Sequence, residues 1–371
     1  MKLYAYYFPN WHQDPKNDKW HGTGWTEWEV LKHATPRFEG HIQPKVPLWG
    51  YEDESDPKVM EKKISAAKGA GIDGFIFDWY WHTDGPYRKR CLEEGFLGAS
   101  NNLDLEFAVM WCNHSCTQLH PTPRSPVGYP LTQSTASKEL FYEITQYCID
   151  NYFNKPNYIK IDGKPYFSIY LPLDFIKEMG EDGAHEAIMD FERRAIEAGY
   201  PGVHMNIAKS FWYRDAMSNV CLLSTEEKNH VIDVMNAQSV AQYSWDQLED
   251  FPAFDYSKVI DLVKEKLLED SKIKKPLAPT VVTGWDPSPR TMQSDIYEWV
   301  GYPFTPIGVN NSPEVFLNNL HEIYEIAKNN KSPFMAITAW NEWTEGNYLE
   351  PCEEFGYGML EAVKQFTDEI K

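Results

Sequence analysis

The feature that most constrains the fold is a recurring alternation of short apolar or aromatic segments with segments of helical periodicity. Eight apolar segments occur, at residues 2–8, 72–79, 105–112, 165–171, 202–208, 232–237, 277–284 and 333–340. Strands that alternate with amphipathic helices form parallel sheets covered by those helices, and eight such strands close a barrel. The sequence therefore predicts an α/β fold, a (β/α)8 TIM barrel.

Two of the intervening helices have clear start signals. Asp56 precedes Pro57, and Ser312 precedes Pro313, which is the order of an N-cap followed by a first helical residue. Apolar residues then follow at helical spacing on one face, at Met60, Ile64 and Ala67 in the first helix and at Phe316, Leu320, Ile323 and Ala327 in the second.

The chain contains no repeat, low-complexity tract or Gly/Ser linker, so we expect one domain over residues 1–371. The sixth strand has the weakest signal, because residues 209–250 are polar and aromatic without a clear period. A long loop there would help to shape a binding cleft.

Composition limits the possible partners. The formal net charge of -20 argues against a nucleic-acid or anionic-membrane surface, because such partners select for clustered Lys and Arg. Aromatic residues make up 15% of the chain, and 14 of them are Trp, which suits the flat faces of sugars. We therefore expect a carbohydrate substrate; oligomeric state is left open.

The six cysteines, at positions 91, 112, 116, 148, 221 and 352, are too few for a chain of this length to imply a disulfide framework. Cys112 and Cys116 could begin a metal site, but no second ligand cluster follows, so we expect reduced thiols, no metal and no cofactor. The N-terminus MKLYAYYFPNW lacks the apolar core of a signal peptide, and no run of 18 apolar residues exists. These features predict a cytoplasmic protein without a membrane segment.

In a (β/α)8 barrel the active site lies at the C-terminal ends of the strands. The residues at these ends are Asn10, Trp11, His12, Asp78, Trp79, Tyr80, Trp81, Trp111, Asn113, Asn206, Trp285, Asp286, Arg290 and residues 340–345. Aromatic walls with carboxylates at the floor are typical of carbohydrate-cleaving sites. Glu342 and Glu345 are spaced so that a turn can point both to one side.

Each of these residues also has a structural interpretation. An isolated Trp at a strand end can plug the barrel, and Arg290 could pair with Asp286. Asp78 follows a buried strand, where a carboxylate is costly unless it is solvated or used. The acidic pair could be a solvated turn, but the interleaved Trp340 and Trp343 argue against that.

The stretch Asn341-Glu342-Trp343-Thr344-Glu345-Gly346 resembles the Asn-Glu-Trp-x-Glu-Gly signature of glycoside hydrolase family 99, the endo-α-mannosidase and endo-mannanase group. The wider chain is more similar still to the related WbsX-type proteins, long labelled glycosyltransferases and described as having a family 99-like domain. The matching motifs are Tyr6-Tyr7, Trp11-His12, Asn17-Asp18, Trp20, Gly22, Thr26-Glu27-Trp28, Pro36, Phe38, Gly40-His41, Gln43-Pro44, residues 71–75, Gly163-Lys164-Pro165, Trp285-Asp286, Arg290 and residues 348–351.

This resemblance implies a (β/α)8 barrel and a retaining hydrolysis through a 1,2-anhydro sugar. Glu342 would be the base on the 2-hydroxyl and Glu345 the acid/base at the leaving oxygen. We accordingly expect an ionised Glu342 and a raised pKa for Glu345. The residues expected to bind the sugar are Trp11, Asp78, Trp79, Trp111, Asn113, Trp285, Arg290, Asn341, Trp343 and Tyr348, with Trp11, Trp285 and Trp343 as stacking walls.

Two departures from the resembled pattern leave the sugar undefined. Thr344 stands where the mannosidases have histidine. Residues 111–116 read Trp-Cys-Asn-His-Ser-Cys where WbsX-type proteins usually have Trp-Ala-Asn-Glu-Asn-Trp. A glycosyltransferase and a non-catalytic sugar-binding barrel remain as alternatives, although no Gly-rich phosphate loop or basic cluster supports the transferase and both glutamates argue for catalysis.

Overall fold

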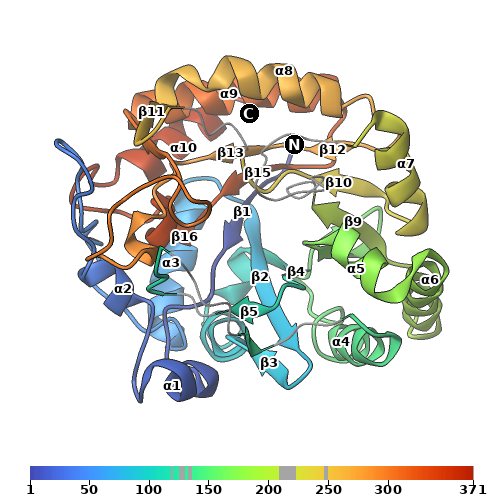
Figure 1. The fold of residues 1–371 in the computed structure, drawn as a ribbon. Coiled ribbons are helices and arrows are strands. Elements are labelled where there is room, and N and C mark those ends of the chain that lie inside the picture. The colour runs from blue at the N-terminus through green and yellow to red at the C-terminus, as the bar shows by residue number, and fades with distance from the viewer. Residues whose placement is uncertain (118–119, 125–129, 133–135, 209–222, 246–249, 371) are drawn as a thin grey trace.

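A parallel barrel forms the centre of the computed structural model, with its helices arranged around the outside (Figure 1). The structure describes residues 1–117, 120–124, 130–132, 136–208, 223–245 and 250–370. The barrel strands are β1 (Leu3–Tyr7), β2 (Gly74–His82), β4 (Glu106–Trp111), β8 (Lys164–Ile169), β9 (His204–Ala208), β10 (Ser239–Ala241), β12 (Leu277–Ala278), β13 (Thr280–Val282) and β15 (Met335–Thr338). Their order in the sheet is β12-β10-β9-β8-β4-β2-β1-β15-β13.

The two ends of this order are one interrupted strand. β12 pairs with β10 and β13 pairs with β15, and only Pro279 separates β12 from β13. Proline has no N–H to donate, which accounts for the break. Its carbonyl still accepts a hydrogen bond from the Ala336 N–H at 3.0 Å. The sheet therefore closes on itself, and the predicted (β/α)8 barrel is confirmed.

The prediction for the sixth strand is wrong. Residues 232–237 were expected to be extended, but α7 (Thr225–Val234) runs into this range, and β10 follows it. Ser224 and Glu227 form a capping box that starts the helix. The apolar run is the buried face of α7, and a short apolar run does not by itself distinguish a strand from a buried helix.

Helix α7 and strand β10 lie within residues 209–250, where a long loop was expected. That expectation is wrong for the helix and strand within 223–245, whereas 209–222 and 246–249 lie outside the described residues.

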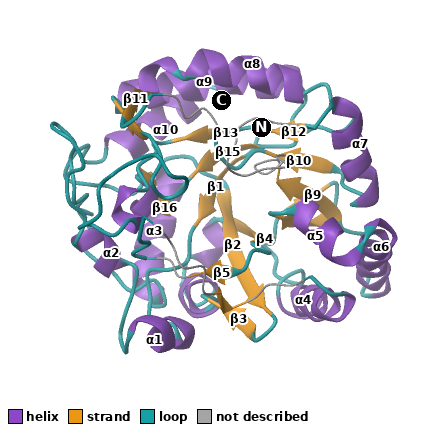
Figure 2. Cartoon of the chain, in the orientation of Figure 1, coloured by secondary structure: helices purple, strands orange, loops and turns teal. Residues whose placement is uncertain are grey.

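The helices form the outer layer around the strands (Figure 2). They are α1 (Pro15–His21), α2 (Trp28–Lys32), α3 (Pro57–Gly69), α4 (Lys138–Asn151), α5 (Pro172–Met179), α6 (Glu181–Glu197), α8 (Ile260–Asp270), α9 (Pro313–Asn329) and α10 (Gly358–Glu369), besides α7. Both predicted caps are confirmed, because Asp56 accepts from the Lys58 N–H and Ser312 accepts from the Val315 N–H. In the described part of the chain, no helix combines the length and apolar character needed to cross a membrane.

Short strands lie in the segments that connect the barrel strands and helices. They are β3 (Gly85–Tyr87), β5 (Cys116–Thr117), β6 (Pro130–Thr132), β7 (Lys160–Ile161), β11 (Ala253–Asp255), β14 (Ile307–Val309), β16 (Asn341–Glu342) and β17 (Asn347–Tyr348). β16 and β17 pair with each other directly after β15, and so build a hairpin at the C-terminal end of a barrel strand.

The close contact between β2 and β4 gives a test of the barrel. A Cβ added at Gly74 would lie 2.3 Å from the backbone oxygen of Glu106, whereas one at Gly69, the last residue of α3, meets nothing within 4 Å. We expect Gly74→Ala to lower the free energy of unfolding by about 1–3 kcal/mol through overpacking. Gly69→Ala, the matched control, should be neutral or stabilising by up to about 1 kcal/mol. Urea unfolding followed by fluorescence measures both, and equal midpoints would contradict the strand contact.

Candidate active site

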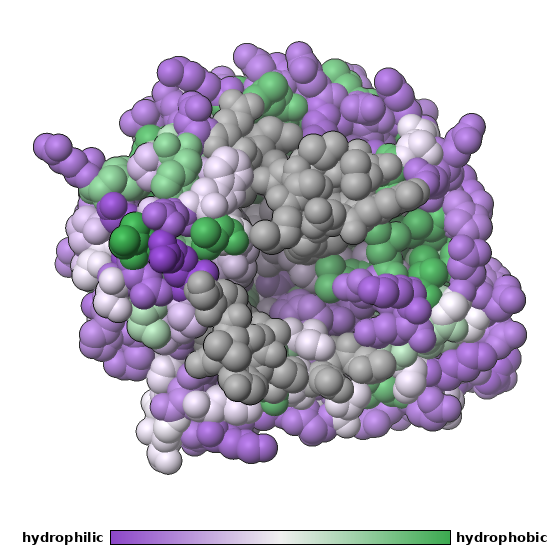
Figure 3. Space-filling view, viewed as in Figure 1, coloured by the Kyte–Doolittle hydropathy of each residue, from purple (hydrophilic) through white to green (hydrophobic). Residues whose placement is uncertain are grey.

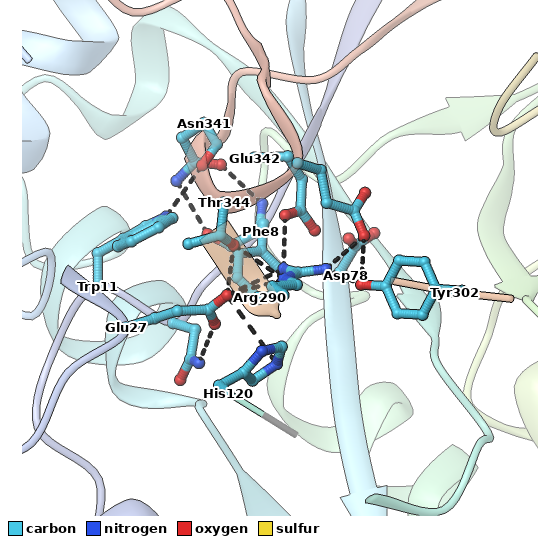
Figure 4. Close-up of polar contacts among 12 residues, drawn as sticks. Phe8, Trp11, Glu27, Asp78, His120, Arg290, Tyr302, Asn341, Glu342 and Thr344 are labelled. Atoms are coloured by element: carbon cyan, nitrogen blue, oxygen red, sulfur yellow. Dashed lines mark hydrogen bonds and ion pairs between the residues drawn. The ribbon is translucent and has the colours of Figure 1, made fainter. Parts of the chain in front are cut away.

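The acidic turn after β15 points two carboxylates into one space. β16 carries Glu342, a single helical turn of the 3-10 type carries Glu345, and β17 returns antiparallel beside β16. Gly346 joins them in the left-handed region at φ 61, where a Cβ would lie 2.6 Å from the Cβ of Asp286. A glycine is thus required at this position for the turn to close. Figure 4 shows Glu342 pointing toward Arg290.

A single buried guanidinium holds the acidic turn. Arg290 Nη2 lies 2.9 Å from Glu342 Oε2, and Arg290 Nη1 donates to Glu345 Oε1. Arg290 Nε donates to Glu27 Oε1 at 3.0 Å (Figure 4). Because Glu27 comes from the start of α2 and the other two carboxyls come from the acidic turn, Arg290 fixes these two segments relative to one another. The structure therefore brings together Glu342, Glu345 and Arg290, and their roles in catalysis stay predictions.

Burial raises the pKa of Glu342 well above its usual range. The charge of Arg290 opposes this shift, and the charges of Glu345, Glu27 and Asp78 add to it. The expectation that Glu342 is ionised stays a prediction, because burial and three nearby carboxyl groups raise its pKa while one guanidinium lowers it. A raised pKa also makes Glu342 a stronger base once it is ionised.

Asp78 faces the same space from β2, as expected (Figure 4). Its Oδ2 accepts a hydrogen bond from the Tyr243 hydroxyl at 2.7 Å, and its buried Oδ1 has no hydrogen-bond partner among the described residues. Burial raises the pKa of Asp78 to about 7, with the Tyr243 hydrogen bond lowering it and the charge of Glu345 raising it. Asp78 can therefore exchange a proton near neutral pH.

Trp11 and Trp343 do not form stacking walls, contrary to prediction. Both side chains have no exposed surface. Trp11 packs on Trp28 with ring centroids 4.0 Å apart, and its Nε1 donates to the Asn341 carbonyl at 3.0 Å. Trp343 stacks on Tyr348 at 3.8 Å. These rings, the buried Tyr348 included, support the acidic turn from behind, which leaves no ring face for a sugar.

Trp79 and Trp111 also point away from the site. Side chains alternate along a strand, so a residue next to the inward Asp78 faces the helices. Trp79 packs near Tyr147 and Tyr152 at the end of α4. Trp111 packs between α4 and α5, on Phe141 and Phe175. The sugar-binding prediction for both is wrong.

Asn113 and Asn341 form structural hydrogen bonds rather than a surface for sugar. The Asn113 side chain exchanges two hydrogen bonds with the Leu171 backbone, at 2.9 and 2.7 Å. Asn341 does the same with the Phe8 backbone, at 2.8 and 2.9 Å. Both amides are buried and use their donors and acceptors within the protein, so they position loops.

Trp285 is the predicted stacking residue that keeps an exposed surface. It is half-buried, and its Nε1 donates to Thr305 Oγ1 at 3.1 Å. Its ring centroid lies 6.3 Å from that of Tyr302, whose hydroxyl donates to Glu345 Oε1 at 2.8 Å. Trp285 and the exposed Tyr302 thus offer aromatic surface beside Glu345.

Sequence reasoning missed several residues of this site. Glu27 is fully buried and accepts from Asn10 Nδ2 at 2.6 Å as well as from Arg290. It belongs to the Thr26-Glu27-Trp28 motif, which carried a signal but no assigned role. Tyr302 and Tyr243 lie in loops without periodicity, so no sequence pattern identifies them.

Two structural interpretations of the sequence are decided by contacts. Asp286 does not pair with Arg290, since its Oδ2 lies 2.8 Å from His41 Nε2 and accepts from Gln43 at 2.6 Å.

Cys112 and Cys116 are buried free thiols. Within the residues the structure describes, no cluster of three His, Cys, Asp or Glu side chains could hold a metal ion.

A buried lysine anchors the acidic turn to α3. Lys63 Nζ lies 2.5 Å from both Glu54 Oε1 and Glu350 Oε1. Glu350 accepts from the indole nitrogens of Trp340 and Trp343 at 2.8 and 2.7 Å. The positions of the turn's tryptophans therefore depend on this ion pair network.

Comparison with known proteins agrees with this architecture. The sequence model of the family described as Glycosyltransferase WbsX matches residues 3–363. Two curated relatives from strains of Xanthomonas campestris pv. campestris, each called "Uncharacterized protein WxcX", are 26% identical over 98% of this chain. The chain spans about half (49%) of their length. One domain over 1–371 stays a prediction.

Solved structures share the fold. The GH99 endo-alpha-mannosidase from Bacteroides thetaiotaomicron superposes with a TM-score of 0.59 at 16% identity, over 99% of this chain and 96% of the mannosidase. A "Glycoside hydrolase-like protein" superposes with a TM-score of 0.61 at 13% identity, over 100% and 94% of the two chains. At these identities the similarity establishes the fold alone.

The lysine anchor can be tested by substitution. Lys63→Met leaves Glu54 and Glu350 buried without their cation, and we expect it to lower the free energy of unfolding by about 3–5 kcal/mol. The control is Lys62→Met, which removes a partly exposed pair with Glu52 and should cost under about 1 kcal/mol. Urea unfolding would measure both, and equal losses would show that the buried network does not hold the turn.

Proposed function

The chain belongs to the Glycosyltransferase WbsX family, and from the geometry of its acidic turn we propose that it is a retaining glycoside hydrolase acting on a glycan or polysaccharide. The observation that carries this proposal is the binding of Glu342 and Glu345, two residues of one turn, by the single guanidinium of Arg290. Two carboxyls held side by side at a barrel rim can share the proton transfers of glycosidic cleavage. The half-buried Trp285 supplies an aromatic surface beside them.

In the proposed mechanism Glu342 accepts the proton of the sugar's 2-hydroxyl. The 2-oxygen attacks the anomeric carbon as the bond to the leaving oxygen breaks, and Glu345 gives that oxygen its proton. Glu345 then takes a proton from water, which attacks the anomeric carbon and opens the 1,2-anhydro ring. Glu342 returns its proton to the 2-oxygen. Every proton is accounted for, and the anomeric configuration is retained after two inversions.

The geometry suits this mechanism better than one with a sugar ester. The 2-oxygen and the leaving oxygen are on adjacent carbon atoms, so a base and an acid from one turn can reach both. The raised pKa of Glu342 favours a base that must deprotonate a weakly acidic hydroxyl. Arg290 keeps both carboxylates oriented throughout.

The name of the family favours a second candidate, a glycosyltransferase of the WbsX type in polysaccharide synthesis. The same two glutamates could serve it, with an acceptor alcohol in place of water. A non-catalytic sugar-binding barrel differs from both, because it would tolerate the loss of either carboxylate.

Substituting each glutamate separates these candidates. On a panel of bacterial polysaccharides, Glu345→Gln and Glu342→Gln should each lower the rate of glycan release by about 10²-fold or more. On an aryl glycoside with a good leaving group, Glu345→Gln should recover much of its first-step rate, whereas Glu342→Gln should not. If the wild type and both variants bind the glycan equally well and none of them releases sugar, the protein is a sugar-binding barrel. If sugar is released only when an acceptor alcohol is added, the protein is a transferase.

The internal nucleophile predicts a strict substrate requirement. A 2-deoxy aryl glycoside should not be cleaved by the wild-type protein, because it lacks the oxygen that attacks. The anhydro-sugar route is wrong if the 2-deoxy glycoside is cleaved at the rate of the parent glycoside. It is also wrong if mass spectrometry finds a sugar ester on either glutamate. Either result would indicate a conventional carboxylate nucleophile.

The pH dependence follows from the shifted pKa of Glu342. A base must be ionised to act, so kcat/KM should fall on acidification at a pH above the ordinary glutamate value of about 4.3. The charge of Arg290 lowers this pKa and the charge of Asp78 raises it. Arg290→Gln should therefore move the acidic limb to higher pH, and Asp78→Asn should move it to lower pH. A limb that stays in place in both variants would assign the titration to another group.

A further inference from the structure

A second arginine, Arg88, lies buried at the end of β3 inside a set of aromatic rings. Its exposed fraction is 7%. Its guanidinium carbon lies 4.8 Å from the ring centroid of Phe8, 4.6 Å from that of Tyr80 and 4.4 Å from that of Tyr87. Such ring faces attract a cation but do not neutralise its charge.

Arg88 lacks the carboxylate that a buried arginine ordinarily has. Within the described part of the chain, no carboxylate oxygen lies within 4 Å of its guanidinium nitrogens, and its buried Nε has no hydrogen-bond partner. Arg290 binds three carboxylates, and the equally buried Arg194 pairs with Asp190 at 2.7 Å. A buried guanidinium without a carboxylate in direct contact is costly, which indicates a function.

Arg88 adjoins the acidic turn. The guanidinium carbon of Arg290 lies 5.3 Å from the centroid of the same Phe8 ring, so Phe8 contacts both arginines. Tyr80 is two residues after Asp78 on β2 and therefore faces the same side of the strand. The charge of Arg88 also lowers the pKa of both Asp78 and Glu27. A group bound by Arg88 would thus lie next to a sugar bound at Glu342 and Glu345.

The backbone of Arg88 is held in an unfavourable conformation. Its φ of 58 lies in the left-handed region, which a residue with a side chain adopts only when its surroundings require it. The Arg88 N–H donates to Asp14 Oδ2 at 3.0 Å, while Asp14 Oδ1 caps α1 through the Lys16 N–H at 2.8 Å. Strain of this kind is concentrated at functional sites.

The histidines near Arg88 add no positive charge at neutral pH. Burial lowers the pKa of His12 to about 4 and that of His120 to about 3, with the charge of Arg88 lowering both further. Arg290 is already bound by carboxylates. Glu27 and Asp78 interact with Arg88 through their charges, but within the described residues neither contacts its guanidinium nitrogens. The guanidinium therefore has no directly bound carboxylate there, and its fork can accept one from a ligand.

We propose that Arg88 binds an oxyanion on the substrate glycan, the carboxylate of an acidic sugar such as a uronic acid, directly beside the bond that is cleaved. A guanidinium fork matches a carboxylate in geometry and in charge. The proposal deepens the proposed function, on which its location in an enzyme site rests. A phosphate-bearing sugar presents the same chemistry with more charge and forms a separate arm of the test.

Equilibrium binding tests this without requiring turnover. The probes are the methyl glycosides of glucuronic, galacturonic and mannuronic acid, each against the neutral methyl glycoside of the same configuration, with mannose 6-phosphate and inorganic phosphate as the phosphate arm. By isothermal titration calorimetry we expect at least one uronic acid to bind about 10-fold or more tightly than its neutral partner, the scale of a charged hydrogen bond. Tighter binding of the phosphate arm would assign the site to a phosphorylated sugar instead.

Variants identify the residue responsible. Arg88→Met should reduce the acidic-to-neutral affinity ratio to about 1, and Arg88→Lys should keep part of it. Arg194→Met, the matched control, removes a buried arginine that also lies over an aromatic ring, at 4.2 Å from Tyr142, and should leave the ratio unchanged. An acidic-to-neutral affinity ratio of 1 in the wild type would contradict the proposal. So would an undiminished preference for the acidic probe in Arg88→Met or Arg88→Lys. Either result would show that Arg88 only fills space among the rings.

Failure of this inference and failure of the proposed function give different results. Glu345→Gln should lower the rate of glycan release by about 10²-fold or more and keep the preference for the acidic probe. If Glu345→Gln leaves glycan release intact while the Arg88 preference holds, the catalytic assignment fails and the anion site stands. If the preference is absent while the glutamate variants lose activity, the anion site fails and the hydrolase assignment stands.

Discussion

The ion pair network around Lys63 is the constraint on which the active-site geometry depends. A buried ammonium between Glu54 and Glu350 is stable only when all three groups keep their partners, so the network has one arrangement. Glu350 fixes the indoles of Trp340 and Trp343, and Glu54 accepts from Asn341 Nδ2 at 2.9 Å. The rigidity of α3 is thereby passed to the turn that carries Glu342 and Glu345.

The front of the same turn carries a larger excess of carboxyl groups over cations. Behind it two carboxylates share one lysine, whereas in front Glu27, Glu342 and Glu345 share Arg290 while Asp78 approaches from β2. Burial raises the pKa of Glu342 and of Asp78, and nearby carboxyl groups, which outnumber the adjacent cations, raise both further. Acid–base catalysis requires such a site, in which a proton can be held by one group and passed to another.

The sequence predicted the barrel because its signals are local. Apolar runs and helix caps each identify one strand or helix. The apolar run at 232–237 was wrongly predicted to be a strand, because the buried face of a helix and a strand look alike over six residues. The spacing of Glu342 and Glu345 is local too. The direction of each tryptophan is harder to predict. Neighbouring residues of a strand face opposite sides, so Asp78 faces the site while Trp79 faces the helices. The burial of Trp11 depends on contacts with Trp28 and Asn341, which come from other parts of the chain. Arg88 and Arg290 share Phe8 only in the folded chain.

The two proposals, for catalysis and for substrate choice, rest on different parts of the barrel. The acidic turn resembles the family 99 signature, and its chemistry concerns atoms that every pyranose with a 2-hydroxyl has. The departure at residues 111–116 puts His114 where the resembled WbsX-type pattern has glutamate, and the His114 ring lies 5.7 Å from that of Tyr80, which also contacts Arg88. A glutamate at that position would bring a counter-charge towards Arg88. A neutral ring stands there instead, because burial lowers the pKa of His114 to about 4. This departure from the resembled pattern is therefore consistent with the proposed binding of an acidic sugar at Arg88.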